Sequence, residues 1–145
     1  MLGWLPVAIV TAIAFGLYNV FIKVSSDRID QVLGAVILQV VALLLGGGFL
    51  LAQHLGGREL AISRSGLLYA ALAGLAVGLA EILSFVVFAR GAPASLGSPI
   101  IMGGSVLVAA LLGVAVLRES LQWSHVGGIA LIVGGIALLS AGSPA

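Results

Sequence analysis

One carboxylate lies deep inside an otherwise apolar stretch of this sequence. Glu81 is the only charged residue between Gly66 and Ala89, and it lies nine residues before Arg90. At 1.5 Å per helical residue this spacing is about 13 Å, which would place Glu81 near the middle of a bilayer. Inserting such a charge costs at least about 2.5–3.5 kcal/mol, and it usually faces a protein interior or a water-filled cavity. We therefore expect Glu81 to be a functional residue.

The helical neighbours of Glu81 suggest what it could bind. At 100° per residue, the residues that share its face of a helix are Gly74, Val77, Gly78, Ser84, Phe85 and Phe88. The glycine end would allow close approach of a helix or a ligand. At the aromatic end, the carboxylate and the ring faces could hold an organic cation. Desolvation favours the neutral carboxylic acid, which would also let Glu81 carry a proton near neutral pH.

Other polar residues at membrane depth could partner Glu81. Asn19 lies one turn deeper than Lys23 in the first apolar stretch, and Gln39 lies within the second. Lys23 ends its stretch and is expected to extend to the interface. A purely structural role stays open, in which Glu81 is hydrogen-bonded to Asn19, Gln39 or Ser84 and fixes helix packing.

The elements that position these residues are five apolar stretches. Of the 145 residues, 61% are hydrophobic and only 8% are charged, whereas a soluble domain has about 25% charged residues. A helix of about 20 residues crosses the hydrocarbon core, and its backbone must be bonded internally. The predicted spans are residues 3–22, 32–51, 66–89, 96–117 and 121–141. The fold class is therefore an all-α polytopic membrane protein, with one five-helix unit over residues 1–145. No basic region precedes the first stretch, so we expect it to remain as a span and not to be a signal peptide.

Glycine patterns indicate where helices approach closely. The last stretch carries two pairs, Gly127–Gly128 and Gly134–Gly135, seven residues apart. Such small residues allow backbones to pack, either within the bundle or between subunits. Gly74 and Gly78 are assigned the same packing role.

Several classes of function find no support in the sequence. There is no cysteine, and neither His54 nor His125 has a second ligand at metal-binding spacing. No nucleophile-and-base pattern is visible at membrane depth, and a net charge of +1 provides no basic patch for nucleic acid. We therefore expect no enzyme activity, no metal, no cofactor and no nucleic-acid partner.

The loop charges show no orientation bias. With five spans, Arg58, Arg64 and Arg118 lie on the side of the N-terminus, whereas Lys23, Arg28 and Arg90 lie on the opposite side. Orientation follows the Lys/Arg bias of short loops, and here the count is three against three. A protein that inserts in both orientations should show this balance; the alternative is that another feature sets the orientation.

The C-terminal third resembles a known transporter unit. Residues 94–99 (ASLGSP) lead into an apolar helix that ends at residues 117–121 (LRESL), followed by the Gly-rich residues 126–136. This resembles the end of an EamA-type unit of the drug/metabolite transporter superfamily. Pro99 and Glu119 match the family's early proline and its turn glutamate, while Arg118 stands where the family often has glycine. The start, Trp4 to Lys23, also resembles the family's first helix.

The resemblance implies an architecture. Most members are similar to two fused units, ten helices arranged as inverted repeats, whereas this chain has one, like the five-helix bacterial and archaeal branch. It implies an integral protein of a bacterial or archaeal plasma membrane that pairs antiparallel with itself, a common transporter plan. Glu81 does not belong to a general family motif.

Together these features predict a secondary transporter of a small cationic or polar organic solute, working by proton-coupled exchange in an antiparallel homodimer. Glu81 would bind the proton or the solute. Asn19, Ser84 and Gln39 would provide hydrogen bonds, and Phe85 and Phe88 would line the pocket. The alternative is a non-transporting or heteromeric membrane subunit, such as part of a lipid-carrier flippase. The sequence specifies neither the solute nor the direction of transport.

Overall fold

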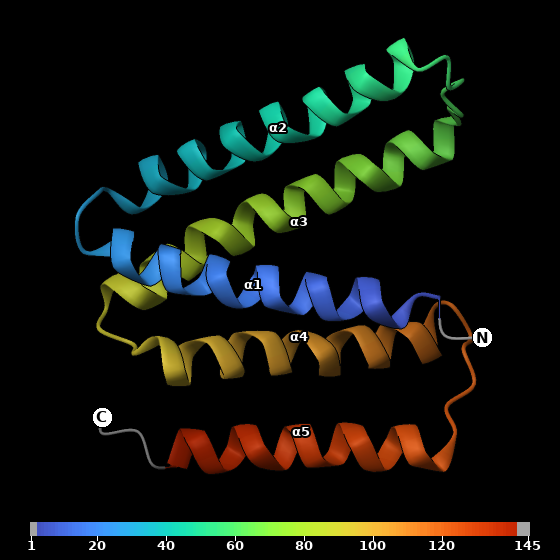
Figure 1. The fold of residues 1–145 in the computed structure, drawn as a ribbon. Helices are drawn as coiled ribbons and strands as arrows, with labels where there is room; N and C mark the ends of the chain where they lie inside the picture. The colour runs from blue at the N-terminus through green and yellow to red at the C-terminus, as the bar shows by residue number, and fades with distance from the viewer. Residues whose placement is uncertain (1–2, 142–145) are drawn as a thin grey trace. The chain divides into compact units, whose positions relative to one another are not determined.

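A computed structural model describes residues 3–141 as five long helices joined by short linkers (Figure 1). The helices are α1 (Leu5–Ser26), α2 (Gln31–Leu55), α3 (Arg64–Ala89), α4 (Ala94–Ala115) and α5 (Trp123–Ala141). Each of them is long and apolar enough to cross a membrane. The predicted all-helical class with five candidate membrane spans is therefore confirmed.

Polar residues in the linkers set the start of two helices. The Asp30 carboxylate accepts hydrogen bonds of 3.0 Å from the backbone N–H groups of Val32 and Leu33 at the start of α2. The Ser63 hydroxyl accepts one of 3.0 Å from Gly66 at the start of α3. Such caps satisfy N–H groups that have no partner within the helix. They explain why both helices begin slightly before the apolar stretches from which they were predicted.

The turn after α4 depends on a left-handed residue. Arg118 has φ 57°, and the next residue, Glu119, donates its backbone N–H to the Gly113 carbonyl at 3.0 Å. Glycine occupies this conformation without steric cost, whereas an L residue with a side chain is strained there. The need for a left-handed turn fits the glycine that the resemblance implies for this position. It also explains why α4 ends at Ala115, two residues before the predicted boundary.

The chain divides into two compact units, and the first contains Val20–Gly91. Helices α2 and α3 lie side by side in this unit (Figure 1). Gly34 makes their close approach possible, because a Cβ at this position would lie only 2.5 Å from Cε1 of the Phe85 ring. The buried apolar side chains of this unit include Ile22, Ala35, Phe85 and Phe88.

The second unit combines Met1–Asn19 with Ala92–Ala145, of which residues 3–19 and 92–141 are described. Helices α4 and α5 lie side by side in it. Their close contact is at Gly103, where a Cβ would lie 2.5 Å from Cδ1 of Ile136. By contrast, a Cβ placed at the α5 glycines Gly127, Gly128, Gly134 and Gly135 meets no atom of a neighbouring element within 4 Å among residues 3–141. Their packing role stays a prediction.

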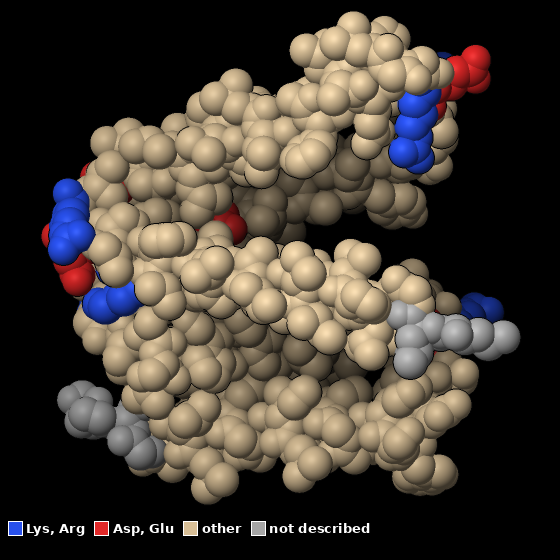
Figure 2. Space-filling view, in the orientation of Figure 1, with Lys and Arg blue, Asp and Glu red and all other residues tan. Residues whose placement is uncertain are grey.

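The surface has the character of a membrane protein. Large apolar side chains are exposed along the helices, among them Leu43 at 72% and Leu131 at 79%. Charged side chains gather at the ends of the helices, whereas the surface between is almost entirely uncharged (Figure 2). Lipid would cover such a surface without the penalty that water imposes.

Candidate functional site

Glu81 lies on the buried face of α3. It is 7% exposed, and the other three buried residues of this helix are Ser84, Phe85 and Phe88. These positions follow one another at intervals of three, one and three, so they form one helical stripe. Ser84, Phe85 and Phe88 of the stripe expected from the sequence are thus buried together with Glu81. At the other end of that stripe, Gly74 and Val77 are exposed.

Helix α2 covers part of this stripe. The Phe85 ring lies against Gly34, whose lack of a side chain makes room for it. One turn before Glu81, a Cβ at Gly78 would lie 3.6 Å from Oε1 of Gln39, so Gly78 and Gln39 meet across the two helices. Gly74 is exposed, and no other atom lies within 4 Å of its Cβ position. Of the two small residues, Gly78 therefore allows a neighbouring polar side chain to approach, whereas Gly74 leaves open space.

Lys23 holds the last turn of α3. Its Nζ donates to the Phe88 carbonyl at 3.0 Å and lies 3.4 Å from a carboxylate oxygen of Asp27. The same carbonyl also accepts from the backbone N–H of Gly91 at 3.0 Å, so Lys23 adds a second, charged donor. A cation at a helix C-terminus also interacts favourably with the helix dipole. The sequence predicted only that Lys23 would extend to the interface. Its position at the end of α1 was the available signal, but the partner lies 65 residues away and no local pattern reveals it.

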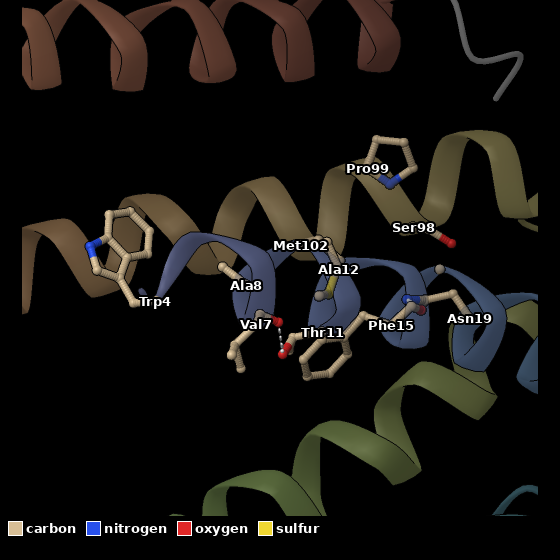
Figure 3. A pocket seen from close by; sticks show the side chains of 11 residues that line it. Trp4, Val7, Ala8, Thr11, Ala12, Phe15, Asn19, Ser98, Pro99 and Met102 are labelled. Atoms are coloured by element: carbon tan, nitrogen blue, oxygen red, sulfur yellow. Dashed lines mark hydrogen bonds between the residues drawn. The ribbon is translucent and has the colours of Figure 1, made fainter. Parts of the chain in front are cut away.

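Asn19 belongs to the other unit. It is 4% exposed, and its side-chain Nδ2 donates to the Phe15 carbonyl at 2.8 Å. Asn19 lies at one end of a cavity between α1 and α4 (Figure 3). Its predicted pairing with Glu81 stays a prediction.

The arrangement around Glu81 suits the binding of a proton or a cation. A proton or a cation that neutralises a carboxylate shielded from solvent lowers the free energy of the buried group. The nearby buried rings of Phe85 and Phe88 offer apolar, aromatic surroundings. Within residues 3–141, no three His, Asp or Glu side chains come together in a way that could hold a metal ion.

Comparison with known proteins identifies the family. Residues 2–141 match the model of the EamA-like transporter family. No curated protein and no solved structure matches the chain. The match covers nearly the whole chain with a single unit, in agreement with the resemblance seen in residues 94–99 and 117–121. The chain therefore belongs to the EamA-like transporter family, as a single unit of that family.

Proposed function

We propose that this protein is a secondary transporter of a small cationic or polar organic solute, and that Glu81 exchanges the solute for a proton. Family membership supports the general class, a drug/metabolite transporter. The observation that carries the finer proposal is the burial of Glu81, at 7% exposure, within a helix apolar enough to span the membrane.

Exchange follows from the electrostatics of such a carboxylate. Burial makes the ionised form of a carboxylate costly, so binding of a proton or a cation is favoured. A proton and an organic cation can each be that partner, and they compete for one group. Ser84 and Gln39 are proposed to hydrogen-bond the solute, and Phe85 and Phe88 to line its site, with Asn19 contributing as well.

We further propose that two copies pair in antiparallel orientation. A single unit of this family implies pairing, and the balanced loop charges favour insertion in both orientations. The exposed α5 glycines provide a surface on which a second chain could pack closely. A heteromeric subunit would instead show one fixed orientation, which a reporter fused to the C-terminus would detect.

The proposal is tested by electrical recording from proteoliposomes on a solid-supported membrane. A panel of organic cations and polar metabolites is applied to wild type, to Glu81→Gln and to Glu59→Gln, which removes an exposed carboxylate from the α2–α3 linker. Solute-dependent currents should disappear in Glu81→Gln and persist in Glu59→Gln. Equal pH-gradient-driven currents in wild type and Glu81→Gln would rule out the coupling role.

A further inference from the structure

A long cavity that is widely open on one side lies between α1 and α4 (Figure 3). Trp4, Val7 and Phe15 line it and are largely exposed, and no residue of the α3 stripe is among its lining residues. All of its lining residues belong to the second unit. Its volume is about 740 Å³, within the range of roughly 300–1,000 Å³ typical of small-molecule sites. It follows α1 from Trp4 to Asn19, a length of about 22 Å at 1.5 Å per residue.

The walls combine apolar surface with a few polar groups. Trp4, Phe15 and Met102 provide large apolar or aromatic faces, and Thr11, Asn19 and Ser98 provide the polar atoms. No charged residue lines the cavity among the described residues. A mostly apolar cavity with few convergent polar groups is the usual composition of a ligand site.

The polar groups are oriented by their own helix. The Thr11 hydroxyl donates to the Val7 carbonyl at 2.8 Å, and Nδ2 of Asn19 donates to Phe15. The hydroxyl proton of Thr11 is thereby used, but its oxygen retains lone pairs that can accept from a ligand. Oδ1 of Asn19 is likewise an acceptor. The wall is therefore suited to a ligand with an N–H or O–H donor.

We propose that this cavity binds the uncharged, ring-bearing body of an amphipathic organic solute, whose N–H or O–H group donates to Thr11 or Asn19. The apolar faces of Trp4, Phe15 and Met102 contact the rings, and the polar groups fix the orientation of the solute. An acyl chain would use the apolar walls but none of the three polar groups. The assignment deepens the proposed transport function and rests on it, but binding in the cavity does not itself require Glu81.

Trp4 provides a direct readout, because it lines the cavity whereas Trp123 does not. In a Trp123→Phe background, Trp4 is the only tryptophan of the chain. Dansylamide serves as the probe: it is uncharged, aromatic, carries an N–H donor, and accepts energy from tryptophan. We expect saturable energy transfer from Trp4 in lipid nanodiscs, reversed by excess benzenesulfonamide.

Variants that fill the cavity test where the probe binds. A Cβ at Gly16, which lines the cavity, meets no other atom within 4 Å, so Gly16→Leu can fill it without displacing a neighbour. Gly47→Leu is the matched control, since Gly47 is equally unobstructed but lies on α2. Gly16→Leu should weaken probe binding by about tenfold or more, and Gly47→Leu should leave it unchanged. Ala8→Leu fills the cavity from a second position and should act like Gly16→Leu.

Each contrary outcome has a separate meaning. Quenching of Trp4 by brominated acyl chains that neither sulfonamide relieves would assign the cavity to lipid and overturn the proposal. A shift from dimer to monomer in Gly16→Leu alone would assign it to a second copy, with the same consequence. Absence of probe binding, with transport still dependent on Glu81, would remove the cavity assignment and leave the transport proposal standing. Unchanged probe binding in Glu81→Gln is expected, even if that variant no longer transports.

Discussion

At the scale of single residues, the sequence identifies part of the candidate site. Glu81 stands out in the sequence because a charge in an apolar run is costly, and the structure buries it on one face with Ser84, Phe85 and Phe88. That face follows from the 3.6-residue period alone. Two residues that shape its surroundings, Gly34 and Lys23, could not be identified in this way. Their partners Phe85 and Phe88 lie far along the chain.

Gly34 provides the first prediction. Gly34→Ala places a methyl group 2.5 Å from the Phe85 ring, so the ring or helix α2 must move. Overpacking of this kind costs about 1–3 kcal/mol, and the melting temperature in detergent should fall. Gly47→Ala is the control, because it meets no neighbour and gains about 0.5–1 kcal/mol of helix propensity. Equal melting temperatures for the two variants would contradict the close packing of α2 and α3.

Lys23 provides the second prediction. Lys23→Met keeps much of the apolar stem but removes the hydrogen bond to the Phe88 carbonyl. The loss should be about 1–2 kcal/mol, measured by unfolding in mixed micelles, since the bond involves a charged donor. Arg28→Met removes an exposed cation of the α1–α2 linker, five residues after Lys23, and should change stability little. If Arg28→Met were as destabilising as Lys23→Met, the capping of α3 would be unimportant.

At the scale of elements, apolar length predicts the helices and polar residues determine their ends. The five spans follow from runs of about 20 apolar residues. Their boundaries shift by a few residues because Asp30 and Ser63 cap α2 and α3 and because the chain turns at Arg118. The packing of helix pairs was less predictable. Gly34 and Gly103 make the close helix–helix contacts, and nothing in their local sequence marks them for this role, since Gly34 has no glycine beside it and Gly103 precedes Gly104. The conspicuous glycine pairs of α5 make no such contact within the described chain.

The turn after α4 is testable. Arg118→Gly relieves a left-handed residue with φ 57° and should stabilise the protein by about 1 kcal/mol. Arg90 ends α3 with φ −77°, so Arg90→Gly removes the same charge without relieving strain. A higher melting temperature is expected for Arg118→Gly only. A gain of the same size in Arg90→Gly would show that charge, and not backbone strain, is responsible.

At the scale of the whole molecule, we propose assembly from two copies, on the basis of the single family unit and the balanced loop charges. Orientation should then respond to single charges. Arg90→Gln leaves the N-terminal side more basic, which favours retention of that side in the cytoplasm and moves the C-terminus outside. Arg58→Gln has the opposite effect. C-terminal reporter fusions should shift in opposite directions for the two variants, starting from a mixture in wild type. A single fixed orientation in all three proteins would favour an unlike partner over a second copy.

The central claim is that solute and proton compete for Glu81, and proton release on solute binding tests it most directly. The solute identified by its currents is added to purified protein in weakly buffered detergent solution with a pH indicator. Wild type and Glu59→Gln should release protons in proportion to bound solute, whereas Glu81→Gln should release none. Release of the same number of protons by Glu81→Gln would contradict the account.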